Sequence, residues 1–80
     1  MKTVLILGGT TGVGKEILKS CVDKGYNVAF CGRKSEVGYE IIQSLQAEDQ
    51  LYFHELDLNS IDEIENYYLG TLERFGKIDA

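Results

Sequence analysis

The feature that most constrains this chain is a glycine-rich loop between an apolar run and an amphipathic pattern. Residues 4–7 read Val-Leu-Ile-Leu, and four glycines follow within residues 8–14. Glycine adopts positive φ angles without a steric penalty and lets a ligand approach the backbone closely. The amides that end such a loop, together with the dipole of the next helix, bind anions. The stretch therefore predicts a buried strand that leads into a helix through a phosphate-binding turn, with a plain strand-to-helix turn as the structural alternative.

The same glycines fit two kinds of phosphate loop. The spacing Gly9-x-x-x-x-Gly14-Lys15 matches the first seven positions of a P-loop, whose next residue supplies a hydroxyl to magnesium. That residue is Glu16, and its carboxylate would bring negative charge close to a triphosphate. A P-loop phosphotransferase is therefore the weaker alternative, and Gly8-x-x-x-Gly12-x-Gly14 is the spacing we favour.

Hydrophobic periodicity predicts alternating strands and helices along the chain. Strands are expected at residues 2–7, 27–31 and 51–56, and the first lacks polar alternation, which is typical of a parallel strand covered on both faces. The expected apolar faces of the helices are Val13, Ile17, Leu18, Cys21 and Val22; Val37, Ile41, Ile42 and Leu45; and Ile61, Ile64, Tyr68, Leu72 and Phe75. This order predicts an α/β fold, a Rossmann-like doubly wound parallel sheet reduced to its N-terminal βαβαβα half, with strand order 3-2-1.

The third helix carries clear signals at both ends. Ser60-x-x-Glu63 is a capping box that predicts its start, and Gly76 predicts its end. Gly70, inside the helix, is expected to destabilise it by about 1 kcal/mol relative to alanine.

Eighty residues suffice for one small domain with a thin core, because a chain of this length buries only about 60% of its unfolded surface. Residues 1–80 are expected to form the N-terminal dinucleotide-binding part of a Rossmann domain that stops before its fourth strand. Lys77-Ile78-Asp79 is the expected entry to that strand. Without it, residues 4–7 are left as an exposed apolar edge, so we expect self-association or a missing C-terminal half that completes the sheet.

Charge is distributed unevenly. The net charge of −5 argues against a nucleic acid as partner, because such contacts depend on neutralising phosphates. Up to Lys34 there are six Lys/Arg and two Asp/Glu, a balance of +4, and from Ser35 onward two against eleven, a balance of −9. The phosphate loop lies in the basic part.

Composition indicates no membrane, disulfide or metal chemistry. No apolar run approaches the roughly 20 residues that span a bilayer, and the N-terminus lacks the pattern of a signal peptide, so a cytoplasmic location is expected. Cys21 and Cys31 form no C-x-x-C motif and fall on apolar faces. They are predicted to be buried thiols, and no metal site is expected.

Four motifs occur in an order that resembles the short-chain dehydrogenase/reductase family. They are Gly8-x-x-x-Gly12-x-Gly14, Gly32-Arg33, Asp57-Leu58 and Gly76-Lys77-Ile78-Asp79, and they extend over the whole chain. Leu7 replaces the threonine that opens the fingerprint of the family, Thr-Gly-x-x-x-Gly-x-Gly. The resemblance implies the cofactor-binding part of an oxidoreductase that transfers hydride between a nicotinamide dinucleotide and a carbonyl or alcohol substrate.

A cofactor site follows from these motifs. Its expected residues are Gly8, Thr10, Thr11, Gly12, Val13, Gly14, Arg33, Lys34, Asp57 and Leu58. The glycines would admit the pyrophosphate, and the two threonine hydroxyls would either donate to it or brace the loop. The resemblance implies that the Asp57 carboxylate meets the adenine amino group, although an aspartate that ends a strand also has a purely structural explanation.

The end of the second predicted strand bears on which dinucleotide is preferred. Proteins that prefer NAD usually carry an acidic residue here for the ribose 2′-hydroxyl, and this chain has Cys31-Gly32-Arg33-Lys34. Arg33 is suited to grip a 2′-phosphate in a bidentate fork, with Lys34 as a second cation. NADP(H) is therefore expected over NAD(H), against the alternative of two solvated surface charges.

The proton-handling residues of the family are not found in this sequence. The family uses a Tyr-x-x-x-Lys pair with a serine, and the residues four after each tyrosine here are Phe30, Gln43, Leu56, Thr71 and Leu72. No catalytic residue is predicted, and the 80 residues alone are expected to be inactive. His54 and the Tyr67-Tyr68 pair are expected to be structural. A short non-catalytic dinucleotide-binding or regulatory module remains the alternative function.

Overall fold

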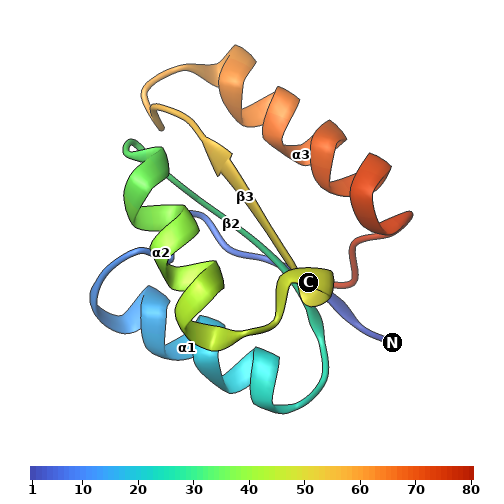
Figure 1. The fold of residues 1–80 in the computed structure, drawn as a ribbon. Helices are drawn as coiled ribbons and strands as arrows, with labels where there is room; N and C mark the ends of the chain where they lie inside the picture. Colours follow the sequence, from blue (N-terminus) through green and yellow to red (C-terminus); the bar gives the residue numbers. More distant parts are fainter.

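The computed structural model describes residues 1–80 as a three-layered α/β arrangement with a parallel sheet in the middle (Figure 1). The elements are β1 (Thr3–Leu5), α1 (Gly12–Asp23), β2 (Asn27–Gly32), α2 (Ser35–Leu45), the 3-10 turn η1 (Glu48–Gln50), β3 (Leu51–Glu55) and α3 (Ile61–Phe75). The predicted Rossmann-like alternation of strands and helices is confirmed. β1 is shorter than the predicted strand over residues 2–7, because the chain turns into the glycine loop earlier.

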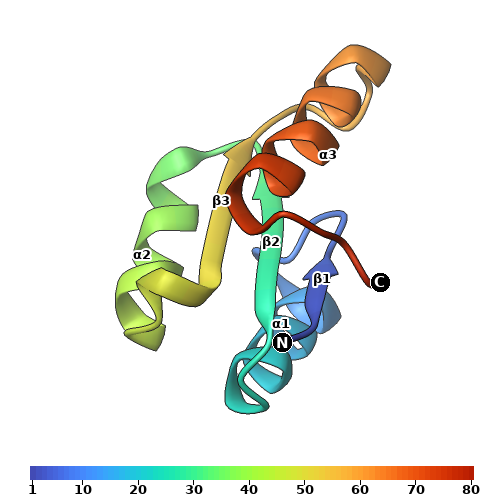
Figure 2. The same ribbon diagram turned by 90° about the vertical axis from the view of Figure 1, so that its right-hand side faces the viewer.

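The sheet has β2 at its centre, with β1 and β3 on either side. Both pairings are parallel, with Thr3 opposite Asn27 and Val28 opposite Leu51. The predicted order 3-2-1 is the same order counted from the other edge. Because all three strands run the same way, their carboxyl ends lie along one edge of the sheet, and the loops that follow them gather there (Figure 2).

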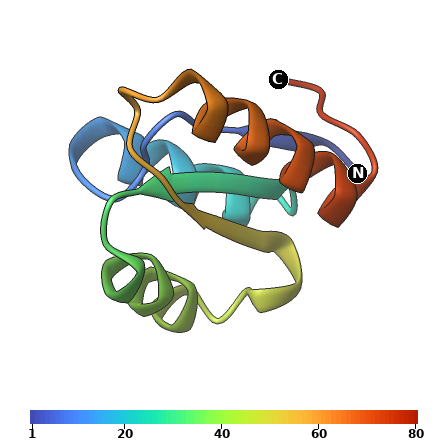
Figure 3. The ribbon, with the colours of Figure 1, turned by 90° about the horizontal axis from the view of Figure 1, so that it is seen from above.

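Helices cover both faces of the sheet. One apolar cluster joins the sheet to α1 and α2, and it consists of Leu18, Val28, Phe30, Ile41, Leu51 and Phe53. A second cluster on the other face joins it to α3 and consists of Ala29, Cys31, Leu56 and Tyr67. The view from above shows α3 and α2 on opposite sides of the sheet (Figure 3). β2 contributes to both clusters, as expected for a central strand buried on both faces.

Helix α3 begins and ends where the sequence predicts, but its packing face differs from the prediction. The Ser60 hydroxyl accepts a hydrogen bond from the Glu63 amide at 3.4 Å, and Gly76 ends the helix at φ 82°. Tyr67 and Thr71 are fully buried, whereas Ile61 is 80% and Tyr68 49% exposed. The helix is rotated because the Tyr67 hydroxyl reaches the Ile6 carbonyl at 2.7 Å.

Helix α1 also departs in part from its expected apolar face. Leu18 is fully buried, but Ile17 is 47% and Val13 76% exposed. Val13 lies in the first turn, beside the glycine loop, where no part of the sheet covers it. The predicted burial of the cysteines is confirmed for Cys31, and Cys21 is half-buried.

The outer edge of β1 is already partly paired by the end of the chain. The Leu5 amide donates to the Ala80 carbonyl at 2.8 Å, and the Asp79 amide donates to the Thr3 carbonyl at 2.8 Å. The Asp79 carboxylate also accepts from the Thr3 amide at 2.8 Å. Residues 79 and 80 thus pair with Thr3 and Leu5, of which Leu5 belongs to the expected apolar edge at residues 4–7, and Leu7 remains 61% exposed. No helix combines the length and apolar character needed to cross a membrane.

Candidate functional site

The glycine loop is tied to β2 by a set of hydrogen bonds at the carboxyl edge of the sheet. The Ile6 amide donates to the Ala29 carbonyl, and the Cys31 amide donates to the Gly8 carbonyl, both at 2.9 Å. The Gly8 amide in turn donates to Sγ of Cys31 at 3.2 Å. Gly8 and Gly9 have φ angles of 107° and 108°, which side chains rarely permit. The turn thus depends on both glycines.

The four loop glycines serve two purposes. A Cβ on Gly14 would lie 3.1 Å from the Gly9 Cα, and a Cβ on Gly9 would lie 3.0 Å from the Phe30 Cβ, so these two allow close packing of helix on loop and loop on strand. A Cβ on Gly8 or Gly12 would meet nothing within 4 Å. Those two glycines face open space beside the backbone, and the loop therefore fits an approaching ligand such as a pyrophosphate.

At the amino end of α1, no capping side chain or acidic residue offsets the positive end of the helix dipole. Thr11 occupies the N-cap position without a side-chain capping bond, and no acidic residue lies in the first turn. Helix α3 differs, because Ser60 caps it and Asp62 and Glu63 lie in its first turn. The first amides of α1 and the positive end of its dipole are therefore available to an anion.

A hollow of about 350 Å³ brings part of the predicted site together. It is lined by Thr10, Thr11, Arg33, Lys34 and Val37. The loops after β1 and β2 meet here closely, since a Cβ on Gly32 would lie 2.9 Å from the Thr10 Cγ2. No carboxylate lines this hollow, and two cations do. We call it the cationic hollow.

A second hollow of about 340 Å³ lies at the end of β3, and Arg33 lines it as well. Its other residues are Glu55, Leu56, Asp57 and Glu63. Asp57 Oδ1 accepts from the Asn59 amide at 3.0 Å, so the side chain takes part in a local turn. Leu58, the next predicted site residue, is 49% exposed. Asp57 thus lines this second hollow, and Arg33 lines both this hollow and the cationic hollow.

Two carboxylates at this end of the sheet have partners that the sequence does not predict. Glu55 Oε1 accepts from the Ser35 amide at 3.3 Å, at the start of α2. Glu63 was expected to complete the capping box, but its Oε2 accepts from the Asp57 amide at 3.3 Å instead. For Glu55 the only signal was its position two residues before Asp57, near a strand end.

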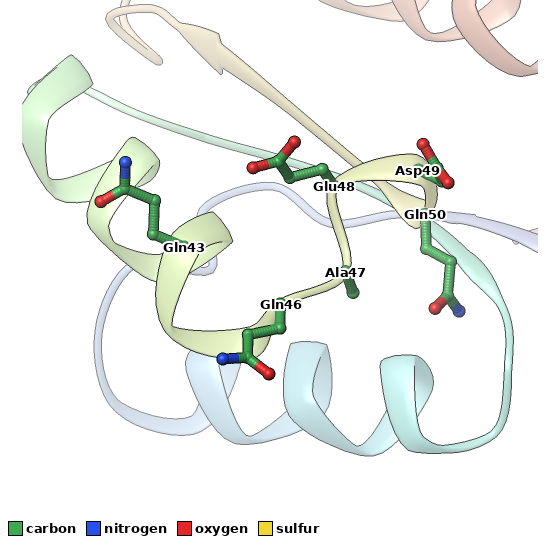
Figure 4. A pocket seen from close by; sticks show the side chains of 6 residues that line it. All are labelled: Gln43, Gln46, Ala47, Glu48, Asp49 and Gln50. Atoms are coloured by element: carbon green, nitrogen blue, oxygen red, sulfur yellow. The ribbon is translucent and has the colours of Figure 1, made fainter.

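The opposite end of the sheet has a hollow of a different character. It measures about 480 Å³ and is lined by Gln43, Gln46, Ala47, Glu48, Asp49 and Gln50, between α2 and β3 (Figure 4). Arg74 of α3 donates to the Glu48 and Asp49 carbonyls at 3.1 and 3.4 Å, outside this lining. With two carboxylates and no cation among its lining residues, this hollow does not suit a phosphate.

The remaining polar candidates have structural partners. The Tyr52 hydroxyl and Nδ1 of His54 are 2.8 Å apart, and the His54 ring lies 5.6 Å from that of Tyr67. Burial raises the pKa of the Cys31 thiol and of the Tyr67 hydroxyl, so both stay protonated at neutral pH. No group of three or more His, Cys, Asp or Glu side chains is placed to hold a metal ion.

Comparison with known proteins gives a consistent result. Residues 2–80 match the family described as short chain dehydrogenase. Short-chain dehydrogenase reductase 3b of Arabidopsis thaliana is 31% identical over 79 residues, which are 99% of this chain and 30% of that protein.

Two solved structures have the same fold. A short-chain dehydrogenase/reductase of Brucella melitensis, described as a glucose/ribitol dehydrogenase, superposes with a TM-score of 0.92 at 26% identity, over 98% of this chain and 33% of its own. An alcohol dehydrogenase of the archaeon Thermococcus sibiricus, complexed with 5-hydroxy-NADP, superposes with a TM-score of 0.88 at 29% identity, over 99% and 34%.

The chain spans about a third of the length of these relatives. The match extends through all three strands and helices, and it does not favour the P-loop alternative or the short regulatory module. The chain belongs to the short-chain dehydrogenase/reductase family, and it represents the N-terminal Rossmann part of that fold.

Proposed function

We propose that residues 1–80 are the NADP(H)-binding part of an oxidoreductase that transfers hydride between the nicotinamide and a carbonyl or alcohol substrate. The observation that supports the proposal is the cationic hollow, which Thr10 and Thr11 line together with Arg33 and Lys34. The relatives named above are dehydrogenases, and the Thermococcus enzyme was solved with an NADP derivative.

The glycine loop is the proposed seat of the pyrophosphate. Gly8 and Gly12 leave open space beside the backbone, and α1 begins there with amides that no protein side chain caps. Val13, exposed in the same turn, would lie against the ligand. Fixed amides and a helix dipole attract phosphate oxygens without any rearrangement, so the loop would orient the dinucleotide as it binds.

Arg33 and Lys34 are the proposed ligands of the 2′-phosphate. Both are exposed and line the cationic hollow without a carboxylate among its other lining residues. A guanidinium group matches a phosphate in bidentate geometry, and an ammonium group adds a second charge. NADP(H) would therefore bind in preference to NAD(H).

Asp57 and Leu58 are the proposed contacts of the adenine. Arg33 lines both hollows, so a nucleotide whose 2′-phosphate is near Arg33 has its base within reach of the end of β3. The half-exposed Leu58 would pack on the ring, and the Asp57 carboxylate would accept from the adenine amino group.

The chemistry would be divided between the cofactor and two parts of the protein. A bound nicotinamide dinucleotide supplies or accepts the hydride. Residues 1–80 would bind and orient it, and a Tyr-x-x-x-Lys pair outside them would handle the proton. Residues 77–80 would lead into a fourth strand beside β1, and we expect a cytoplasmic protein that is inactive when reduced to these 80 residues.

Substitution of Arg33 tests the cofactor preference. Arg33→Asp in the full-length protein should weaken NADPH binding by about 30-fold or more and NADH binding by less than about threefold, because a carboxylate repels the 2′-phosphate. Titration calorimetry measures both affinities. Lys24→Asp, the same charge change at the C-cap of α1, is the matched control and should change neither.

Two results would contradict parts of this proposal. Equal losses for both dinucleotides would remove Arg33 from the 2′-phosphate and leave the fold assignment intact. A wild-type protein that binds neither dinucleotide would contradict the proposed function itself.

A further inference from the structure

Two buried side chains lie directly beneath the glycine loop and reach it from different elements. Cys31 comes from β2 and Tyr67 from α3, and both are 0% exposed. The Tyr67 hydroxyl donates to the Ile6 carbonyl at 2.7 Å, across 61 residues of sequence. Sγ of Cys31 lies 3.8 Å from the same carbonyl. Side chains from β2 and α3 thus meet at the Ile6 carbonyl oxygen, on the backbone that enters the loop.

Cys31 holds the first glycine of the loop through two hydrogen bonds of opposite direction. Its amide donates to the Gly8 carbonyl at 2.9 Å, and its Sγ accepts from the Gly8 amide at 3.2 Å. Both polar groups of Gly8 are therefore bonded to one residue. Because burial raises the pKa of the thiol, it stays protonated, and its hydrogen is free to point to the Ile6 carbonyl while the sulfur accepts.

These bonds act at a glycine, the residue type with the greatest backbone freedom. Gly8 has a φ of 107°, and a Cβ placed on it would meet nothing within 4 Å, so no side-chain packing at this residue would hold the peptide in place. A flexible glycine that must become ordered on binding weakens affinity, whereas one ordered in advance does not. The Gly8 amide already donates to sulfur and is therefore not free to donate to a ligand. This bond instead fixes the direction in which the chain enters the rest of the loop.

We propose that Cys31 and Tyr67 are positioning residues that fix residues 6–8 in the shape that receives the pyrophosphate. The inference rests on the proposed dinucleotide site, and it adds to that site two residues that touch no ligand. Apolar packing explains their burial, but a valine and a phenylalanine would pack equally well. The polar atoms of both residues are directed at the loop.

The chain offers matched controls for both residues. Tyr67→Phe removes one hydroxyl and keeps the ring, and Tyr68→Phe makes the same change on the exposed neighbour. Cys31→Ala removes the sulfur, and Cys21→Ala makes that change on the half-buried cysteine of α1. Cys31→Ser retains a shorter hydrogen-bond acceptor. It should therefore restore part of the protection from hydrogen exchange that the Gly8 amide loses in Cys31→Ala.

Two measurements on the full-length protein test the proposal. The first is hydrogen exchange of the Gly8 amide without ligand, which should become at least about tenfold faster in Cys31→Ala than in Cys21→Ala because the acceptor is gone. The second compares NADPH with adenosine 2′-monophosphate, which lacks the pyrophosphate. Tyr67→Phe should lower NADPH affinity about fivefold and change the affinity for the monophosphate less than about twofold.

The outcomes separate the positioning role from general destabilisation and from the proposed function. Unchanged Gly8 exchange in Cys31→Ala, or equal losses for the two ligands in Tyr67→Phe, would overturn the inference. If the wild-type protein bound no dinucleotide, the proposed function would fail, and Gly8 exchange would still decide whether Cys31 braces the loop.

Discussion

Gly38 shows how the absence of a side chain sets the distance between α2 and β3. It is buried in the second turn of α2, and a Cβ placed on it would lie 2.4 Å from Cγ of Phe53. The Phe53 ring is held in turn by Phe30, with ring centroids 5.1 Å apart. The added methyl group would meet the ring atoms nearest the backbone, Cγ, Cδ1 and Cδ2, and these cannot swing aside. Helix α2 or the sheet would therefore have to move.

Gly38→Ala should therefore lower the free energy of unfolding by about 2 kcal/mol, as overpacked cores do. Helix propensity alone predicts the opposite, a gain of about 1 kcal/mol from replacing a helical glycine. Urea denaturation of the full-length protein gives the sign directly. Gln43→Ala, an exposed change in the same helix, serves as the control, and a stabilised Gly38→Ala variant would disprove the close packing.

Asp79 makes the pairing at the β1 edge sensitive to pH. Its carboxylate accepts from the Thr3 amide at 2.8 Å and lies 3.2 Å from Nζ of Lys77. The bond to the Thr3 amide, with that to Lys77, holds the pKa of Asp79 below its ordinary value. Because the folded-state pKa is the lower one, the stabilisation is present above the ordinary pKa of an aspartate and is lost as the pH falls through the folded-state value.

Asp79→Asn should accordingly be less stable than the wild type at pH 7, and the difference should shrink on acidification below about pH 4. Denaturation curves at pH 7 and pH 3 provide the comparison, with Asp23→Asn at the end of α1 as a control. A difference that is constant between the two pH values would show that the Asp79 carboxylate does not brace β1.

At the scale of elements, α3 shows what its sequence leaves open. Its start and end follow from Ser60 and Gly76, which act locally. Its packing face does not, because the helix is apolar on two sides, and the residues that decide between them are distant. Tyr67 finds the Ile6 carbonyl, and Gly70 receives Tyr52. Neither partner can be identified from the periodicity of residues 61–75.

Gly70, expected to weaken α3, instead makes room for the sheet. A Cβ at this position would lie 2.4 Å from the Tyr52 hydroxyl, which is 2.8 Å from Nδ1 of His54. Gly70→Ala should thus destabilise the protein by about 1 kcal/mol in place of the gain that helix propensity predicts. The test is a double-mutant cycle measured by urea denaturation.

Tyr52→Phe removes the oxygen with which the new methyl group collides. Gly70→Ala should therefore be less destabilising in the Tyr52→Phe background than in the wild type. If the two changes proved additive, the contact between Gly70 and Tyr52 would not explain why glycine occupies this position.

For the molecule as a whole, the order of elements and the parallel sheet could be predicted, because apolar runs alternate with amphipathic patterns along the chain and the last helix has local end signals. The position of the loop glycines and of Arg33 and Lys34 followed from that order, since parallel strands bring their carboxyl ends together. The hydrogen bond from the Ser35 amide to the Glu55 carboxylate and the bonds between Cys31 and Gly8 could not be predicted. They join residues far apart in sequence whose types carry no such signal.

For the whole molecule, the central proposal is that the dinucleotide binds at the carboxyl edge of the sheet. Amide chemical shifts of the full-length protein during titration with NADPH test it most directly. Residues 8–14, Arg33 and Lys34 should shift, and the hollow lined by Gln43, Gln46 and Gln50 at the other end should not. Shifts confined to that opposite hollow, or no shifts at saturating NADPH, would contradict the account.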